Sequence, residues 1–485
     1  EKLGCRPWAA HERVELVQGD VLDLESLTEA AMGCWAAYYL VHSMIAQKDK
    51  FVEADRQAAH NMVKASAAAG LERILYLGGL AEAKQGALSK HLMSRIEVAT
   101  ILQSGPVPTT DLRAPMILGS GSASFEILRY LVEHLPAMIT PRWVQSLNQP
   151  IAIRNVIGYL VGCLSHDETT GQTYDIGGPD VLTYRNLLDI YAQEAGLRKR
   201  LVLPVPVLTP TLSAYWINFI SPVPTAIALP LTEGLTSEAV CTENRIRSII
   251  PQELLSCRDA LRTALDKLKQ EQVDACWMDA GAMLEPEWAH CGDAHWAGGT
   301  ILSCGYRVRI RAAAEDIWEP ISRICGRTGW YHLDILWRLR GLVDRLAGGA
   351  GLRRGRRHPS ELMVGDALDF WRVLKVDPPQ QLLLLAEMKT PGEALLEFRL
   401  TPIGDKQTEL QMLSRFLPQG LGGILYWYFL YPFHKWVFYG MLKSIAQSIN
   451  KPIVSGPERF TPPLTASCAL PPTLAGNSPG YAARR

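Results

Sequence analysis

Apolar positions follow two different patterns along the first 270 residues. Short runs with no polar alternation are separated by segments in which apolar residues recur every three to four positions. Unbroken apolar runs are typical of strands covered on both faces of a parallel sheet, and the longer period indicates helices. The apolar runs are 36–41 and 74–77, a third strand is predicted at 109–112, and the helical segments are 26–32, 51–69 and 89–102. Strands alternating with such helices predict right-handed βαβ units in a doubly wound, Rossmann-like parallel α/β sheet.

The same region contains segments with weaker patterns. RVELV at 13–17 and QTYDI at 172–176 predict two more strands, and 136–150 predicts irregular structure. Residues 201–235 combine many prolines with large apolar side chains, which excludes one clean bilayer-spanning helix. We expect this last segment to form a lid or wall over an apolar pocket.

The second half of the chain has the pattern of an antiparallel sheet with helices. The predicted strands are 306–310, 369–376, 381–389, 394–401 and 407–416, and the predicted helices are 314–325 and 422–449. One strand, a helix, several strands and a long terminal helix predict an α+β domain in which the helix packs into a curved sheet.

Composition suggests where the domains divide. Residues 1–270 form the first domain, 271–304 a linker rich in Trp, Ala and Gly, and 305–450 the α+β domain. The segment 451–485 is rich in Pro, Ser and Gly, which predicts a disordered tail.

Charge and cysteine content narrow the classes of function. Lys+Arg and Asp+Glu both number 49, so no net field attracts nucleic acid. The 10 cysteines are scattered, as expected for reduced thiols of a cytoplasmic protein, and no signal peptide opens the chain. His290, Cys291, His295 and Cys304 have spacings that fit no common zinc site, so we expect no metal.

His91 and Arg95 are the first candidate functional residues. They lie four positions apart in a predicted helix that begins after Ser89, so both side chains share one face. That helix follows the strand ending at Gly78 and Gly79, and ligands of open α/β sheets bind at the carboxyl ends of the strands. The alternative is that both are ordinary first-turn residues facing solvent or a carboxylate.

Several motifs resemble a known family. GDVLD at 19–23, AYYLVHSM at 37–44, ILYLGGL at 74–80, HLMSR at 91–95 and YDIGGPDVLTY at 174–184 are similar to the atypical, NmrA-like branch of the short-chain dehydrogenase/reductases. The sequences at 328–349 and 364–373 resemble the uncharacterised DUF2867 domain of the START-like, helix-grip lipid-binding superfamily. Together the two parts resemble bacterial two-domain NAD(P)-binding oxidoreductases.

The resemblance implies that the protein binds NAD or NADP. The chain also differs from the family in its first residues. Family members open with a strand and a Gly-rich turn that holds the pyrophosphate at a helix N-terminus. No such turn precedes Arg13, so we expect a fragment that lacks the first βαβ unit, roughly 30 residues, and therefore binds the dinucleotide more weakly.

By the same resemblance, cofactor positions can be assigned residue by residue. Asp20 and Val21 would meet adenine, although Asp20 could instead be a turn residue. The strand-end residues near a ribose are Leu40, Val41 and His42. The residues beside the nicotinamide ribose are Leu77, Gly78 and Gly79, and those flanking the nicotinamide are Arg113, Ala114 and Pro115.

Catalytic residues of the family are replaced in this chain. Active members use a Tyr and a Lys four residues apart with an upstream Ser. Here His91 and Arg95 occupy the first two positions, and Gly78 or Gly79 the third. His91 could act as an acid near neutral pH, whereas Arg95 could bind ribose or phosphate but not exchange protons.

Three functions are compatible with these residues. The first is an NAD(P)-dependent oxidoreductase acting on a hydrophobic, lipid- or quinone-like substrate. The second is a non-catalytic dinucleotide-binding redox sensor or membrane-complex scaffold, resembling the SDR-like accessory subunit of respiratory complex I. The third is lipid transfer by the C-terminal domain alone.

Two further segments suggest peripheral membrane contact. Arg353, Arg354, Arg356 and Arg357 form a basic cluster that could meet phosphate or an anionic lipid surface, although such a run is more often a solvated turn. The aromatic stretch 425–439 could line a lipid pocket, rest at an interface or form a buried helix, and its Pro, His and Lys argue against a bilayer span.

Overall fold

The computed structural model divides the chain into two compact units. The first unit is Arg6–Ala282, and the second is Met283–Arg485 together with Glu1–Cys5. The structure describes residues 3–4, 6–41, 51–80, 89–205, 210–221, 223, 225–235, 237–270, 286, 288, 301–326, 328–352, 354–404 and 406–461. The division falls inside the segment predicted as a linker.

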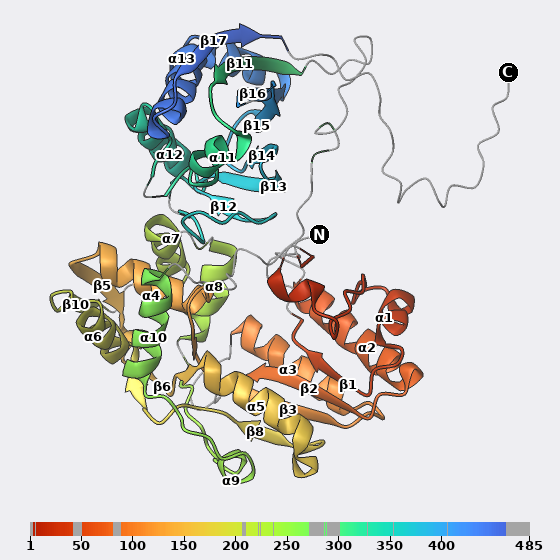
Figure 1. Ribbon diagram of the computed structural model, residues 1–485. Helices are drawn as coiled ribbons and strands as arrows, with labels where there is room; N and C mark the ends of the chain where they lie inside the picture. Colours follow the sequence, from red (N-terminus) through yellow and green to blue (C-terminus); the bar gives the residue numbers. More distant parts are fainter. Residues whose placement is uncertain are drawn as a thin grey trace. The chain divides into compact units, whose positions relative to one another are not determined.

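A four-stranded parallel sheet organises the first unit (Figure 1). Its order is β1-β2-β3-β8, and all three pairings are parallel. The strands are β1 (Ala36–Tyr39), β2 (Arg73–Gly79), β3 (Thr109–Ala114) and β8 (Thr173–Asp175). The order and direction confirm the predicted doubly wound, Rossmann-like sheet, and β2 extends two residues further than predicted to include both glycines.

Helices cover both faces of this sheet because its strands are apolar on both sides. Ile74 and Tyr76 pack with α2 (Phe51–Ala69) and α3 (Lys90–Gln103). Leu75 and Leu112 pack on the other face with α5 (Ile153–Ser165). The predicted helix 51–69 is confirmed at both ends, and Gly70 follows it with φ +74°, a conformation that favours glycine.

A second layer of elements lies beyond the carboxyl ends of β2 and β3. Its helices are α4 (Ala123–His134), α6 (Tyr184–Glu194), α7 (Pro210–Ile220), α8 (Thr225–Gly234) and α10 (Cys257–Lys269). Its short strands are β4 (Ile117–Leu118), β5 (Ala137–Pro141), β6 (Leu147–Asn148), β7 (Ile151–Ala152), β9 (Leu182–Thr183) and β10 (Leu201–Val205). The remaining helices are η1 (Pro7–Ala10), α1 (Leu24–Ala31), η3 (Arg142–Gln145), η4 (Asp167–Thr169) and α9 (Ile246–Ile249).

Two predictions for the first unit are wrong. Residues 13–17 form no strand, and Leu16 and Val17 are exposed, because no strand of the described residues pairs with them. The segment 136–150 is not irregular throughout, since β5 pairs in parallel with β10. Both errors arise because strand formation depends on a partner that local sequence does not specify.

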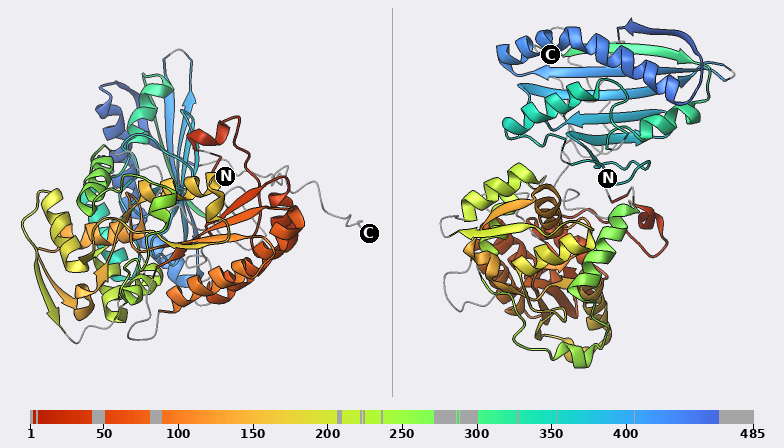
Figure 2. Two further views of the ribbon diagram at one scale, coloured as in Figure 1. Left: turned by 90° about the horizontal axis from the view of Figure 1, so that it is seen from below. Right: turned by 90° about the vertical axis from the view of Figure 1, so that its left-hand side faces the viewer.

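The second unit is a seven-stranded antiparallel sheet with helices on one face. The strand order is β12-β13-β14-β15-β16-β11-β17. The strands are β11 (Leu302–Ile310), β12 (Ala367–Leu368), β13 (Trp371–Asp377), β14 (Gln381–Ala386), β15 (Gly392–Pro402), β16 (Thr408–Pro418) and β17 (Ile453–Phe460). The helices are α11 (Ala314–Ser322), α12 (Asp334–Leu346) and α13 (Gly420–Ser448), and the right-hand view of Figure 2 shows α13 lying along the sheet. This confirms the predicted α+β class.

Two predictions for the second unit are also corrected. The segment predicted as a disordered tail begins with β17, which pairs antiparallel with β11; residues 462–485 lie outside the described residues. The basic cluster is not a solvated turn. Arg354 pairs with Glu387, Arg357 pairs with Asp366 at 3.0 Å, and Arg356 donates to backbone carbonyls, while Arg353 is not described.

Candidate functional site

A cavity of about 390 Å³ lies where β2 and β3 end in the first unit. The lining from the ends of β2 and β3, the residues that follow them and the start of β4 is Leu77, Gly78, Gly79, Leu80, Ala114, Pro115, Met116 and Ile117. Helices α4, α6, α7 and α8 supply most of the remaining wall, mainly with Leu and Ile side chains. The proline-rich segment 201–235 therefore forms part of a wall over an apolar pocket, as predicted.

Helix α3 brings His91 and Arg95 to the wall of this cavity. The helix begins there because the Ser89 side chain accepts a hydrogen bond from the backbone N–H of Leu92 at 3.2 Å. The Arg95 guanidinium lies 5.2 Å from the centre of the Tyr76 ring and donates to the carbonyl of Leu77. Arg95 is thus a positive charge held in place at the carboxyl end of β2.

Gly78 and Gly79 present bare backbone to the cavity. A Cβ atom at Gly78 would lie 2.6 Å from Oδ1 of Asp111, and one at Gly79 would lie 3.3 Å from Leu92. A side chain at Gly78 would therefore displace the Asp111 carboxyl group. Asp111 is 4% exposed, and burial raises its pKa from the ordinary value of 3.8 to about 6, although Arg113 and Arg95 oppose that rise.

Asn148 and Tyr184 form a polar pair in the same wall. The side-chain amide of Asn148, which is 1% exposed, donates to the Tyr184 hydroxyl at 2.6 Å. Burial raises the pKa of Tyr184 to about 12, so the phenol stays protonated and can donate. In the sequence Tyr184 is only the last residue of the motif at 174–184 and has no assigned site, and Asn148 lies in the segment predicted as irregular. Their contact spans 36 residues, so no local signal joins them.

The predicted site residues divide into two groups. Those that line the cavity are Leu77, Gly78, Gly79, His91, Arg95, Ala114 and Pro115. Those that do not are Asp20, Val21, Leu40, Val41 and Arg113. His42 lies outside the described residues.

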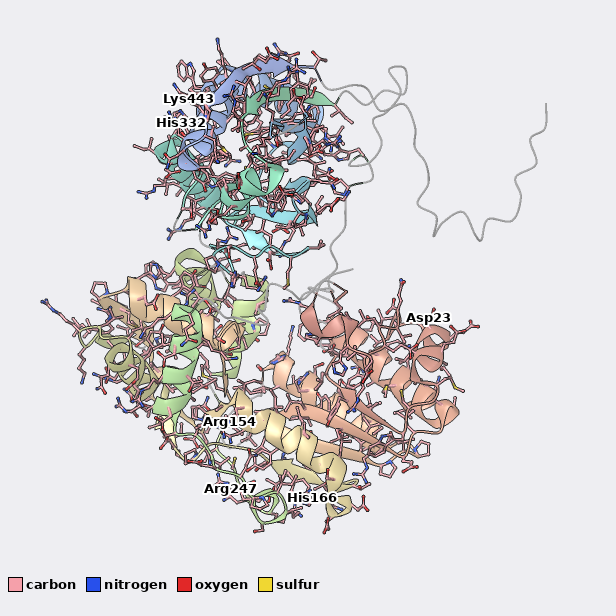
Figure 3. The ribbon with its side chains drawn as sticks, in the orientation of Figure 1. Asp23, Arg154, His166, Arg247, His332 and Lys443 are labelled. Atoms are coloured by element: carbon pink, nitrogen blue, oxygen red, sulfur yellow. The ribbon has the colours of Figure 1, made fainter. Side chains whose placement is uncertain are left out.

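Local contacts explain the positions of two residues that do not line the cavity. Asp20 Oδ1 accepts from the N–H of Leu22 at 2.9 Å in the turn before α1, the helix that begins beyond Asp23 in Figure 3. Arg113 pairs with buried Asp175 at 2.6 Å. Their cofactor roles stay predictions.

A second cavity, of about 550 Å³, lies within the second unit between the sheet and α12 and α13. Its lining includes Trp337, Trp371, Leu396, Phe416, Trp427, Phe429, Leu430, Phe433, His434 and Phe438. His434 stacks on Phe438 with ring centres 5.2 Å apart, and burial lowers the pKa of His434 to about 4. The histidine is therefore neutral at physiological pH, and most of the residues that line the cavity are apolar.

Two kinds of feature are absent from the described residues. No group of three or more His, Cys, Asp or Glu side chains there could hold a metal ion. No helix among those residues combines the length and apolar character needed to cross a membrane.

Comparison with known proteins gives a family match for part of the chain. Residues 296–441 match the family described as "Protein of unknown function (DUF2867)". No curated protein is significantly similar to this chain.

Solved structures with a related fold include three enzymes. A nucleoside-diphosphate-sugar epimerase from Staphylococcus aureus is 17% identical, covering 53% of this chain and 85% of that chain, with a TM-score of 0.42. The triphenylmethane reductase of Citrobacter sp. is 20% identical, and the match covers 52% of this chain and 84% of the reductase, with a TM-score of 0.42. The NADPH-dependent quinone oxidoreductase of Escherichia coli, solved with NADPH, is 16% identical. The match covers 53% of this chain and 85% of that enzyme, with a TM-score of 0.43.

Proposed function

We propose that the first unit is an NAD(P)-dependent oxidoreductase of the atypical short-chain type that acts on a hydrophobic, lipid- or quinone-like substrate. The observation that carries this proposal is the apolar cavity at the carboxyl ends of β2 and β3, which His91 and Arg95 border. In doubly wound sheets this edge is where ligands bind. An apolar wall with few polar groups suits a substrate with one reactive oxygen.

The residues at this edge fit the nicotinamide half of the cofactor. Gly78 and Gly79 leave backbone uncovered at the wall, and Ala114 and Pro115 opposite them are small, so a flat ring can approach. Arg95 would hold a ribose hydroxyl or a phosphate oxygen. When bound, the cofactor would supply the hydride.

Three side chains would act on the substrate. His91 would donate a proton to the substrate oxygen, because an imidazole changes its charge near neutral pH. Tyr184 would donate a hydrogen bond to the same oxygen, since its hydroxyl accepts from Asn148 and its own proton remains for a ligand. Arg95 would fix the cofactor without exchanging protons.

Titration of the full chain with NADH and NADPH, followed by nicotinamide fluorescence, tests cofactor binding. We expect Arg95→Ala to raise the dissociation constant about tenfold, because a charge-assisted hydrogen bond contributes roughly 1.5 kcal/mol or more. Arg56→Ala is the matched control: it removes the same charge from an exposed ion pair with Glu97 between α2 and α3. Equal binding by wild type and Arg95→Ala would contradict this placement of the cofactor.

Reduction of a panel of apolar quinones and carbonyls tests the chemistry. We expect His91→Ala to lower kcat about a hundredfold with cofactor affinity unchanged. Ser124→Phe, which fills the cavity, should raise KM, whereas Thr100→Phe on the exposed side of α3 should not. Cofactor binding without turnover of any substrate would favour the alternative, a non-catalytic redox sensor or scaffold.

The second cavity favours a second function, binding of an apolar molecule by the second unit. A volume of about 550 Å³ enclosed mainly by aromatic and aliphatic side chains can hold a fatty or isoprenoid chain. Binding of a fluorescent fatty-acid probe to the full chain tests this. Ala394→Phe on β15 lines the cavity and should abolish binding, while Thr401→Phe, exposed on the same strand, should leave it intact. Equal binding by both variants would contradict the assignment.

A further inference from the structure

Helix α12 packs Leu336 and Trp337 against the core of the second unit but leaves a second set of apolar residues exposed. Ile335, Leu339, Leu342, Val343 and Leu346 are all exposed, with Leu346 74% exposed, and their spacing places them along one stripe. The residues turned inward include Asp344, which is fully buried. An outward apolar stripe of this length indicates a surface that is covered in function.

The first two-thirds of α13 continue this exposed apolar surface. Leu425, Tyr428, Phe429, Phe433, Trp436 and Tyr439 are exposed, with Phe429 at 71% and Trp436 at 63%. Figure 2 shows α12 and α13 on the same side of the sheet, in the right-hand view. Tyr and Trp have an apolar ring and a polar edge, which suits the boundary between lipid and water. We call these residues of the two helices the α12–α13 face.

Helices α12 and α13 together carry more positive than negative side chains. Helix α13 contains no Asp or Glu, and Lys435 and Lys443 are exposed on it (Figure 3 labels Lys443). The two acids of α12 are engaged by backbone. Asp334 accepts from the N–H of Trp330 at 2.8 Å, and Asp344 accepts from those of Gly351 and Lys389 at 2.7 and 2.6 Å. The face is therefore complementary to a negatively charged partner.

The second cavity opens through this face. Leu339 and Val343 of α12 and Phe429 and Phe433 of α13 are exposed, and all four also line the cavity. The two stripes thus meet at the cavity. An apolar molecule entering between these residues would pass directly from whatever the face contacts into the cavity.

We propose that the α12–α13 face docks on the surface of an anionic lipid bilayer. The aromatic and aliphatic side chains enter the boundary of the acyl chains, and Lys435 and Lys443 contact anionic headgroups. A protein partner would also bury apolar residues, but the combination of exposed Trp and Tyr, lysines without acids on α13, and a cavity opening among them fits lipid best.

Flotation of the full chain with vesicles tests the proposal. We expect binding to phosphatidylcholine vesicles containing about a third phosphatidylglycerol, and weaker binding to phosphatidylcholine alone and at raised salt. Phe429→Glu combined with Trp436→Glu should weaken binding at least tenfold, because two apolar side chains no longer enter the bilayer. Tyr215→Glu, on α7 of the first unit and 60% exposed, is the matched control and should bind like wild type.

Two more variants make the test independent of any one helix. Ile335→Glu with Leu346→Glu, on α12, should weaken binding as well, and Lys435→Glu should weaken binding to anionic vesicles by roughly fivefold per unit of charge. The proposal would be overturned if both double variants floated with vesicles as well as the wild type does. It would also be overturned if the wild type did not bind vesicles. A wild-type dimer in sedimentation equilibrium that the α13 variant converts to a monomer, without vesicle binding, would instead assign the face to pairing of two copies.

Discussion

The two units each enclose an apolar cavity beside a sheet, but they surround it with different polar groups. In the first unit the cavity lies beyond the ends of parallel strands, and Arg95, Asp111, Arg113 and Asp175 are clustered around those ends. In the second unit the cavity lies between the face of an antiparallel sheet and two helices, and its histidine is neutral. The carboxyl ends of parallel strands bring charged side chains together, which suits catalysis. The face of an antiparallel sheet presents apolar side chains, which suits the binding of an apolar molecule.

The difference extends to how the units respond to pH. Asp111 in the first unit has a raised pKa, so its charged form is disfavoured by folding. His434 in the second unit has a lowered pKa, so its charged form is disfavoured as well. Because one group gains charge on deprotonation and the other on protonation, acid should affect the two units in opposite directions.

Asp175→Asn should give the largest change in stability. The Asp175 carboxylate is fully buried and accepts from Arg113 at 2.6 Å and from the N–H and hydroxyl of Thr242 at 2.9 Å. We expect loss of this charge to lower the free energy of unfolding of the first unit by about 3 kcal/mol, measured by denaturant titration. Asp189→Asn, whose ion pair with Lys199 spans 3.6 Å, should change it by less than about 1 kcal/mol. Equal effects would show that the Asp175 cluster is not structural.

Asp111→Asn should stabilise the first unit, in contrast to Asp175→Asn. With a pKa of about 6 when folded and 3.8 when unfolded, Asp111 makes stability fall as pH rises from about 4 to 6, and the loss is complete above 6. The neutral amide avoids it, so thermal melts at pH 8 should show a gain on the order of 2 kcal/mol, and melts at pH 4 almost none. A destabilised variant at pH 8 would show that Arg113 and Arg95 outweigh the cost of burying the Asp111 charge.

His434→Phe should flatten the pH dependence of the second unit. The histidine has an ordinary pKa of 6.5 when unfolded and about 4 when folded, so its contribution is complete above pH 6.5 and is lost as pH falls toward 4. Scanning calorimetry should show wild-type stability falling by on the order of 2 kcal/mol over that interval, and the variant falling less. His134→Phe, at the exposed end of α4, is the control. An unchanged profile in the His434 variant would mean that other groups govern the acid response.

Tyr184→Phe should give the smallest effect and the most specific one. It removes the hydroxyl that pairs with Asn148 while keeping the ring in the first cavity. We expect a rise in KM of about fivefold, equivalent to one hydrogen bond of roughly 1 kcal/mol, with cofactor affinity unchanged. Tyr174→Phe removes a hydroxyl bonded to the carbonyl of Glu168, away from the cavity, and should leave KM unaltered. If both variants behave alike, Tyr184 does not contact the substrate.

The sequence by itself determined the class of each unit and the positions of five helices, α1, α2, α3, α11 and α13. Apolar runs with no alternation identified β1 and β2, and the alanine-rich stretch closed by Gly70 identified α2 at both ends. The spacing of His91 and Arg95 placed both on one face of α3, where they line the first cavity. These features depend on periodicity and capping, which are properties of neighbouring residues.

Tertiary structure decided what depended on distant partners. RVELV at 13–17 has a strand pattern but no strand to pair with, whereas the Pro- and Ser-rich segment after 452 forms β17 because the edge of β11 is available. Likewise the basic cluster is neutralised by Glu387 and Asp366, and Asn148 reaches Tyr184 only through the folded chain. Strand pairing and buried hydrogen bonds join residues far apart in sequence, so local pattern cannot specify them.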